Sequence, residues 1–363
     1  MSKRTTAAFL LALATAVFAL LAAGCGGDDD DESAGQGPGT TTGTTAEEPR
    51  ETVELTVTIP FPSGVAFYPL FVAEDRGYFE EEGLSVDVQP VDGSGATLQQ
   101  LLAGQADVAL PSPGPFMQGV ARGNDIVSVY TLYQQNVFSV QTLADSEVQS
   151  LEDLEGQTVG VGALDGGETP FVKAALSEEA GLEEGDYKLL AVGDGGAASV
   201  ALRRGDVAAY AAAFPDVATM RLRGLDLRNL LPETFQSFFD SLVVVERSFV
   251  EENEEAVAGL GRALAKATVW GLENPEGVLD ITGKSFPEEN EDRDFTLALL
   301  KETQSLYELP GGAEGRWGEA SPEAVERYMN FLVEQGELER PVDTNIFVND
   351  FVEQYNDFDE AGL

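Results

Sequence analysis

The amino-acid sequence contains no histidine and a single cysteine among its 363 residues. Without histidine, the chain lacks the commonest general base, the commonest metal ligand and any Ser-His-Asp arrangement. The single cysteine excludes a disulfide bond within the chain. From these absences we predict no catalytic residue, no metal site and no cofactor. A hydrolase that works with two carboxylates stays possible on composition, because the chain has 64 Asp and Glu residues.

Positive charge is also scarce. Lys and Arg number 21, and the net charge is −43. This charge disfavours nucleic acid and other polyanions as partners. We interpret it as a solvated surface whose like charges keep the protein soluble, with adaptation to high salt as the alternative. Hydrophobic residues make up 43% of the chain, which is typical of a globular protein, and the length suffices for two lobes.

The longest apolar stretch lies at the N-terminus. Two basic residues precede the apolar run 9–23, which is too short to span a membrane comfortably and is typical of a signal peptide. The run ends in Leu21-Ala22-Ala23-Gly24-Cys25, which resembles a bacterial lipobox with Ala22 in place of the usual leucine. A buried thiol is the alternative for Cys25, but the polar residues that follow leave nothing to bury it. We predict that residues 1–24 are a lipoprotein signal peptide and that Cys25 carries the lipid.

A polar segment follows Cys25. Residues 26–50 consist largely of Gly, Thr, Asp, Glu and Pro. Such a segment cannot bury enough apolar surface to offset the entropy of ordering it. We predict a disordered tether over residues 25–51, and a flexible chain of this length reaches roughly 25–30 Å. The tether would hold the folded body just off the outer face of the cell membrane.

Alternating strand and helix patterns fill the rest of the chain, up to a tail that is nearly all helical. Strands are predicted at 53–59, 84–91, 108–110, 126–133, 137–143, 158–162, 187–192, 207–212, 225–230 and 241–246. In the tail, helices are predicted at 254–273, 276–286, 294–307, 322–335 and 346–355. The pattern restarts near residue 150, and this restart predicts two α/β units followed by the helical tail.

The stretch 60–84 organises the first unit. Its proline-rich turn follows a strand, Ser63 can cap the next helix, and Gly77 suits the position after that helix. Through one motif of its own and three later ones, this stretch resembles the start of a family of bacterial solute-binding proteins that serve importers for nitrate, sulfonates, taurine and thiamine-pyrimidine precursors. The motifs are Asp75-Arg76-Gly77-Tyr78-Phe79 with Gly83-Leu84, then Asp92-Gly93-Ser94-Gly95, then 102–109, then 153–161.

The resemblance implies a fold, a role and partners. The fold would be α/β and two-lobed, like that of periplasmic binding proteins, with mixed but mostly parallel sheets flanked by helices. The first lobe would comprise residues 52–141 and 241–363 and the second lobe residues 142–240, with a hinge at crossings near 140–144 and 238–242. The protein would be a monomer that delivers a small solute to the permease and ATPase of an ABC importer, and it would not be an enzyme.

Ligands of open α/β sheets bind at loops beyond the carboxyl ends of strands, and these loops supply our candidate site residues. In the first lobe the candidates are Phe61, Ser63, Phe67, Tyr68, Ser94, Gly95, Thr97, Ser112, Gln134, Gln135 and Asn136. In the second lobe they are Asp165, Glu168, Thr169, Asp194, Phe214 and Asp216. The alternatives stay open here: the aromatic residues can be ordinary core, the hydroxyl residues can be helix caps, and the acids can be solvated.

None of these candidates is Lys or Arg, and the net charge is strongly negative. We therefore predict a small heteroaromatic or amine-bearing ligand such as a pyrimidine precursor, which the aromatic residues could stack against and the acids could hold by its amino groups. Nitrate, taurine or an alkanesulfonate is the alternative, because the helix starts near Ser94 and Thr169 could bind an anion. The alternative from another class is a secreted, carboxylate-dependent hydrolase.

Overall fold

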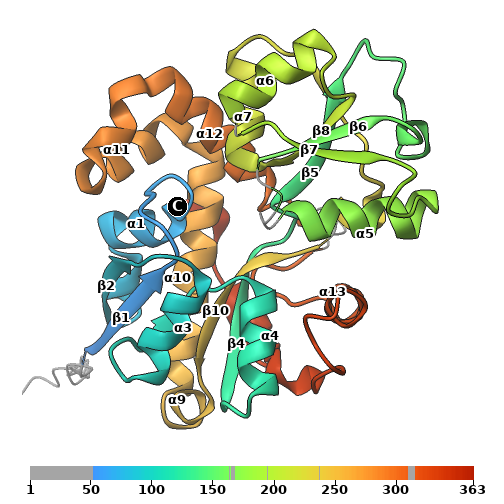
Figure 1. Ribbon diagram of the computed structural model, residues 1–363. Helices are drawn as coiled ribbons and strands as arrows, with labels where there is room; N and C mark the ends of the chain where they lie inside the picture. The colour runs from blue at the N-terminus through green and yellow to red at the C-terminus, as the bar shows by residue number, and fades with distance from the viewer. Residues whose placement is uncertain (1–51, 163, 165–167, 194, 237, 310–314) are drawn as a thin grey trace, which may run out of the picture. The chain divides into compact units, whose positions relative to one another are not determined.

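The computed structural model describes residues 52–363 except 163, 165–167, 194, 237 and 310–314 (Figure 1). The predicted signal peptide, the lipidation site at Cys25 and the tether lie outside the described residues. So do two of the candidate site residues, Asp165 and Asp194.

The first sheet has the strand order β2-β1-β3-β10-β4. Its strands are β1 (Val53–Ile59), β2 (Leu84–Pro90), β3 (Val108–Ala109), β4 (Ile126–Tyr133) and β10 (Asp240–Glu246). Strand β1 pairs in parallel with β2 and β3, whereas β10 runs antiparallel to β3 and β4. Every residue of β4 is buried, including the polar residues Ser128 and Thr131, so the strand is covered on both faces.

The second sheet has the strand order β7-β6-β8-β5-β9. Its strands are β5 (Phe138–Leu143), β6 (Thr158–Val161), β7 (Lys188–Ala191), β8 (Ala209–Ala213) and β9 (Leu227–Asn229). Strands β6, β7 and β8 are parallel, and β5 runs antiparallel to both β8 and β9. Both sheets are therefore mixed, with helices on their faces (Figure 1). We call the parts built around the first and second sheets the first and second lobes.

The chain passes between the lobes twice. It leaves β4 at Tyr133 and enters β5 at Phe138, and it returns between β9 and β10 through the short helix α8 (Glu233–Gln236). The second sheet thus begins at Phe138, earlier than the boundary at residue 142 that we expected from the sequence. The alternation over 137–143 predicts a strand but does not show which sheet it joins, because the hydrogen-bonded partners β8 and β9 come much later in the chain.

In the tail, the helices predicted over 254–335 lie close to their predicted positions. The helices of the two α/β units are α1 (Tyr68–Arg76), α2 (Tyr78–Glu81), α3 (Ser94–Leu102), α4 (Pro113–Ala121), α5 (Glu168–Ala180), α6 (Gly195–Arg204) and α7 (Phe214–Leu222), with the 3₁₀ turn η1 (Glu152–Leu154). In the tail they are α9 (Arg247–Glu252), α10 (Glu254–Glu273), α11 (Pro275–Ser285), α12 (Arg293–Ser305), α13 (Pro322–Glu334) and α14 (Val352–Tyr355), with the 3₁₀ turns η2 (Pro287–Asp292), η4 (Thr344–Ile346) and η5 (Glu360–Gly362).

One helix is shorter than predicted. The sequence predicts a helix over 346–355, but only α14 forms there. Phe347 instead makes a parallel bridge with Ser128, and the Val348 N–H donates to the Ser128 carbonyl at 2.8 Å. Pairing with the edge of β4 replaces the local helical preference in this segment.

Packing also joins the lobes away from the two crossings. Helix α12 of the first lobe packs along α7 of the second, and the two helices lie side by side in Figure 1. On α13, Phe331 contacts Phe171 of α5, with ring centroids 6.5 Å apart. No described helix is both long enough and apolar enough to cross a membrane.

Candidate functional site

The loop after β1 begins a chain of aromatic rings that runs from one lobe to the other. Phe61 is 40% exposed, and its ring lies 5.1 Å from that of Phe67. Phe67 stacks on Tyr133 at 6.3 Å, and Tyr133 contacts Phe214 edge-on at 6.4 Å. Phe214 is the first residue of α7 in the second lobe. We call Phe61, Phe67, Tyr133 and Phe214 the aromatic chain, and its exposed end at Phe61 offers a surface for a flat ligand.

The other two aromatic candidates that we predicted from this stretch pack in the core. Phe67 and Tyr68 have no exposed surface. The Tyr68 hydroxyl donates to the Thr268 carbonyl at 3.1 Å, and burial raises the pKa of Tyr68 well above its usual value. Tyr68 therefore links α1 to α10, and the ring of Phe67 packs against that of Phe61.

Three polar residues form a cluster where β3 and β10 meet. The Ser112 N–H donates to Ser94 Oγ at 3.1 Å, and the Ser112 hydroxyl donates to Asp240 Oδ1 at 2.9 Å. Asp240 is 8% exposed, and this burial raises the pKa of its carboxyl to about 6. The next residue, Ser241, has a φ of +48°, a conformation that is uncommon for non-glycine residues. We call these residues the Ser94–Ser112–Asp240 cluster.

The neighbouring helix start holds the other two candidates from this region. The Thr97 hydroxyl donates to the Ser94 carbonyl at 2.8 Å, and its side chain is buried. Gly95 is exposed in the first turn of α3. Thr97 therefore braces the start of α3, and Ser94 and Gly95 are the residues there that face solvent.

A carboxylate from the helical tail fills the turn at Ser63. Glu289 accepts hydrogen bonds from the Ser63 hydroxyl at 2.6 Å and from the Gly64 and Val65 N–H groups at 3.1 and 3.2 Å. Ser63 Oγ also accepts from the Ala66 N–H at 3.1 Å. Helix α1 begins at Tyr68 with Phe67 at its N-cap position, so Ser63 holds the turn before the helix and does not cap the helix as we expected. The donors that this turn could offer to an anion are thus already bound by a side chain of the protein.

The first crossing is held by amide side chains. Gln134 Nε2 donates to the Thr131 and Glu319 carbonyls, Gln135 Nε2 to the Glu308 carbonyl, and Asn136 Nδ2 to the Phe235 carbonyl. Beside this crossing, a cavity of about 200 Å³ is lined by residues of both lobes. Gln141 borders it, and Gln141 Oε1 is buried without a hydrogen-bond partner. The predicted amides therefore hold the first crossing in place.

In the second lobe, the described candidates hold the starts of helices. Glu168 Oε1 accepts from the Gly162 N–H at 3.0 Å. Asp216 accepts from the Gly195 N–H at 2.7 Å and from the Ala213 N–H at 3.3 Å, and so joins the starts of α6 and α7. Thr169 is buried in the first turn of α5. Sequence position alone placed these residues near a cleft, and their hydrogen bonds give them a structural role as well.

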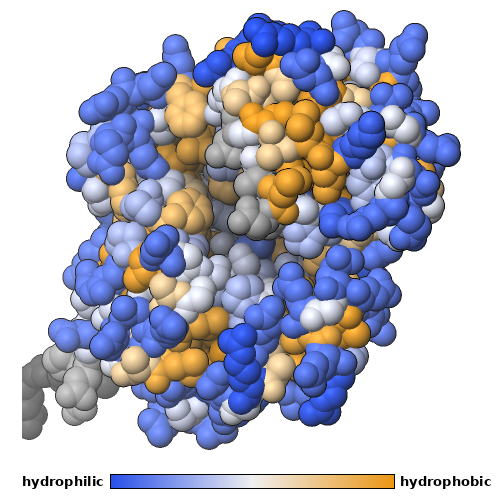
Figure 2. All heavy atoms as spheres, viewed as in Figure 1, coloured by the Kyte–Doolittle hydropathy of each residue, from blue (hydrophilic) through white to orange (hydrophobic). Residues whose placement is uncertain are grey.

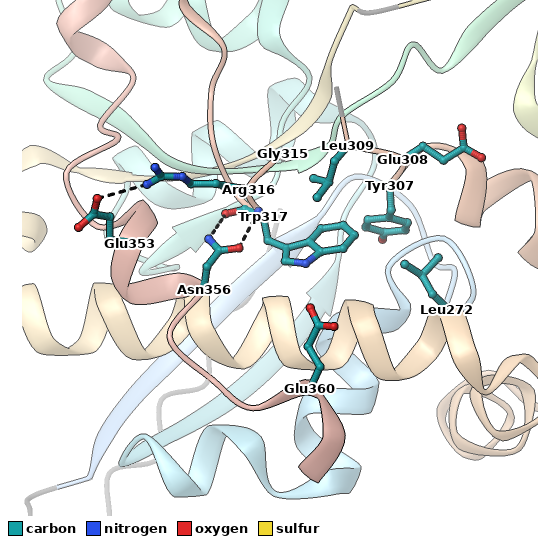
Figure 3. A pocket seen from close by; sticks show the side chains of 10 residues that line it. All are labelled: Leu272, Tyr307, Glu308, Leu309, Gly315, Arg316, Trp317, Glu353, Asn356 and Glu360. Carbon is teal, nitrogen blue, oxygen red and sulfur yellow. Dashed lines mark hydrogen bonds and ion pairs between the residues drawn. The ribbon is translucent and has the colours of Figure 1, made fainter. Parts of the chain in front are cut away.

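Two hollows are visible. Figure 2 shows one where the lobes meet, with hydrophobic and hydrophilic residues around it. A second hollow of about 950 Å³ lies on the first lobe, where Trp317 and Tyr307 face each other beside the Arg316–Glu353 ion pair (Figure 3). The described residues around this second hollow all belong to the tail, so it does not lie between the lobes. Within the described ranges, no group of acidic or thiol side chains could hold a metal ion.

Sequence reasoning missed Tyr133, Asp240 and Glu289. Asp240 carries a weak signal, because a charged residue opens the otherwise apolar strand Leu242–Val245. Glu289 carries none, since it lies in an acidic run with nothing to distinguish it. Tyr133 ends a buried strand, and sequence alone does not show that its ring links two lobes.

Comparison with known proteins agrees with this geometry. A family model described as NMT1/THI5 like matches residues 65–278, more than half of the chain. The formylaminopyrimidine-binding protein of Halalkalibacterium halodurans is 29% identical over 304 residues, which cover 82% of this chain and 89% of that protein. The riboflavin-binding protein RibY of Chloroflexus aurantiacus is 25% identical over 306 residues, which cover 82% of this chain and 86% of that protein.

The fold is shared with solved structures. The periplasmic aliphatic sulphonate binding protein SsuA of Escherichia coli superposes with a TM-score of 0.62 at 15% identity, covering 82% of this chain and 92% of that one. The periplasmic-binding-protein fold expected from the sequence is therefore confirmed. The match over residues 65–278 establishes that the chain belongs to the NMT1/THI5-like family.

Proposed function

We propose that this protein is the extracytoplasmic solute-binding component of an ABC importer, and that it captures a nitrogen-containing heteroaromatic compound of the pyrimidine-precursor type. The protein would be a monomer without catalytic activity. The ligand would bind between the lobes and be delivered to the permease and its ATPase. Ligand binding favours a closed arrangement only through contacts that are made in that arrangement.

One observation carries the proposal: aromatic rings and acidic or hydroxyl groups meet where the lobes join. Arg221 also lies at this junction, but it is paired with Glu302. The aromatic chain runs from Phe61 to Phe214, and the Ser94–Ser112–Asp240 cluster lies at the carboxyl end of β3. Neither set contains Lys or Arg. A flat ligand gains about 0.5–1.5 kcal/mol per aromatic contact beyond burial, and its amino groups can donate to the acidic and hydroxyl oxygens.

The turn after β1 supports the same ligand class. An anion would need its N–H donors, but Glu289 already accepts from Gly64 and Val65. A small strong anion also gains most from Arg, and the net charge of −43 repels it. The two curated relatives described above are named for a formylaminopyrimidine and for riboflavin, which are both nitrogen heteroaromatics.

Attachment to the membrane completes the proposal. Cys25 would carry the lipid, and residues 25–51 would tether the body to the outer face of the cell membrane. The tether would hold the binding lobes near the permease. This part rests on the sequence of the first 51 residues, which lie outside the described residues.

A thermal-shift panel tests the ligand class. Aminopyrimidines and riboflavin are compared with taurine, methanesulfonate and nitrate, each at the same concentration. A ligand at 100 times its dissociation constant stabilises the folded state by about 2.7 kcal/mol, and we expect this only from the heteroaromatic compounds. Stabilisation by a sulfonate or nitrate alone would mean that the anion-binding alternative is right.

The same samples separate binding from hydrolysis. Each compound that stabilises the protein, together with a set of aryl glycosides and esters, is incubated with the protein and analysed by chromatography. We expect stoichiometric binding and full recovery of every compound. Repeated turnover of any of them would favour the carboxylate-dependent hydrolase instead.

A further inference from the structure

We propose that Asp240 recognises the ligand. Its carboxylate oxygen Oδ2 accepts a hydrogen bond from an amino or amidinium N–H of a planar nitrogen compound held between the lobes. The inference rests on the binding function proposed above. It adds a recognition residue and the chemical group of the ligand that this residue binds. Asp240 is not among the residues that the sequence pointed to.

Asp240 lies where a recognition residue can meet ligand. It is the first residue of β10, immediately after the second crossing between the lobes. In the sheet it is paired with Tyr133, which belongs to the aromatic chain. Its hydrogen-bond partner Ser112 lies shortly after Ala109, the last residue of β3, and immediately before α4. The aromatic chain and the polar cluster therefore meet at this carboxylate.

The two oxygens of Asp240 differ in their surroundings. Oδ1 accepts from the Ser112 hydroxyl at 2.9 Å and from the Ser241 N–H at 2.6 Å. Oδ2 has no hydrogen-bond partner among the described residues. Some side-chain atoms of these residues are fully buried and lack a partner, and Oδ2 is not one of them. Oδ2 therefore keeps contact with solvent although the residue is only 8% exposed.

Among the described residues, no cation compensates the charge of Asp240. Its two described partners are an N–H and a hydroxyl, and no Lys or Arg contributes to its titration. The ionisable groups of the described residues that face it are the phenols of Tyr133 on β4 and Tyr328 on α13, and both stay neutral because burial raises their pKa values. A buried carboxylate without a cation is costly, and a ligand that supplies an N–H donor or a positive charge offsets this cost.

The hydrogen-bonding pattern of the cluster limits the ligand further. Oδ1 is occupied, so Asp240 can offer only one oxygen and not the paired oxygens that a guanidinium prefers. Next along the cluster, the Ser94 hydroxyl hydrogen has only a long contact of 3.4 Å with Ser112 Oγ. An acceptor beside a hydroxyl that donates only over this long contact suits an amino group next to a ring nitrogen, as on an aminopyrimidine.

Calorimetry on variants tests the inference. Wild type, Asp240→Asn and the charge-matched control Asp125→Asn are titrated with 4-amino-5-hydroxymethyl-2-methylpyrimidine, riboflavin and benzamidine. Asp125 is 77% exposed and pairs with Arg247 at the opposite end of β4. We expect Asp240→Asn to weaken the amino-bearing ligands by about ten- to a hundredfold, the range for a charge-assisted hydrogen bond, while Asp125→Asn binds like wild type.

Benzamidine separates this inference from the proposed function, because its amidinium group tests Asp240 without being a natural solute. If wild type binds benzamidine through Asp240 but none of the pyrimidines or riboflavin, the inference stands and the proposed ligand class fails. If wild type and Asp240→Asn bind every compound equally, or if wild type binds none, the role of Asp240 is refuted. If wild type binds none of these three compounds and only taurine or methanesulfonate stabilises it in the thermal-shift panel, both proposals are refuted.

A pH comparison gives a readout that a purely structural role would not change. Benzamidine stays protonated between pH 5.0 and 7.5. A carboxyl whose pKa is about 6 loses most of its negative charge when the pH falls from 7.5 to 5.0. Wild-type affinity should therefore fall by about tenfold at pH 5.0, because about one carboxyl in ten remains ionised one unit below its pKa. The Asp240→Asn protein should show no such fall. An equal affinity of wild type at both pH values would overturn the inference, even if the variant did not fold.

Discussion

Arg221 on α7 of the second lobe forms an ion pair with Glu302 on α12 of the first lobe. Glu302 is largely buried, with 13% of its side chain exposed, whereas Arg221 is half exposed. Burial raises the pKa of Glu302, and Arg221 opposes that rise. Both residues line the 200 Å³ cavity beside the first crossing. The pair is therefore a contact between the lobes that shares this cavity with Phe214, the second-lobe end of the aromatic chain, and it can stabilise one arrangement of the lobes.

The first prediction concerns this contact. Arg221→Ala should lower the free energy of unfolding by only about 1 kcal/mol, because the arginine is exposed. It should change the small-angle scattering of the ligand-free protein, because a bond between the lobes is lost while each lobe stays intact. Arg316→Ala is the matched control, since Arg316 is 49% exposed and pairs with Glu353 within the first lobe. Identical scattering from the two variants would show that the Arg221–Glu302 pair does not set the arrangement of the lobes.

The second prediction concerns Glu289, whose carboxylate holds the turn after β1. Glu289→Gln should lower the free energy of unfolding by about 1–3 kcal/mol. The Gly64 and Val65 N–H groups share Oε2, and the single oxygen of Gln can serve both, but an NH2 group would replace Oε1, which accepts from the Ser63 hydroxyl. Glu288→Gln is the control, because Glu288 is exposed and adjacent in the chain. Chemical denaturation measures both. Equal stability of the two variants would mean that Glu289 is not needed to hold the turn.

The third prediction concerns the N-terminus. In a host that processes bacterial lipoproteins, wild type should fractionate with the membrane and Cys25→Ser with the soluble extracytoplasmic proteins, because a serine cannot receive the lipid. Mass spectrometry of the wild-type N-terminal peptide should show an acylated Cys25. Equal membrane association of the two proteins would exclude Cys25 as the anchor.

The elements of the fold could be predicted because their signals are local. Alternation over Val53–Ile59, the glycine at 77 in a left-handed conformation and the proline in the first turn of α1 each act within a few residues. The start of the second lobe could not be placed as well, since the partners of β5 are 70 to 90 residues further along the chain. The helix expected at 346–355 was displaced for the same reason, by pairing of Phe347 with Ser128.

The candidate site was less accessible to sequence reasoning. Loop position identified Phe61, Ser94, Ser112 and Phe214, which the structure places in the aromatic chain or the polar cluster. It did not separate exposed Phe61 from buried Tyr68, because burial depends on α10 packing against the loop. It also missed Asp240 and Glu302, whose partners are 128 and 81 residues away. Contacts of this kind are set by the packing of lobes and helices and leave no local pattern.

The fourth prediction treats Asp240 as a group that lowers stability. Its pKa is about 6 in the folded protein against an ordinary value of 3.8, so the folded state holds the proton more tightly than the unfolded state does. Asp240 therefore does not lower the free energy of unfolding below about pH 4. It lowers this free energy increasingly between pH 4 and 6, and by the full amount above pH 6. A difference of about two units corresponds to at most about 3 kcal/mol.

Asp240→Asn removes this titration but keeps a side-chain oxygen that can accept from Ser112. The variant should match wild type near pH 4 and exceed its free energy of unfolding by about 1–3 kcal/mol above pH 6. Urea denaturation at several pH values measures the difference, and Asp125→Asn should show no comparable pH-dependent gain because Asp125 is exposed. A gain at neutral pH, combined with lost affinity, would indicate a carboxylate retained for binding at the expense of stability. A variant that is less stable than wild type at pH 7 would instead show that the carboxylate stabilises the fold, and that its hydrogen bonds with Ser112 and Ser241 outweigh its desolvation.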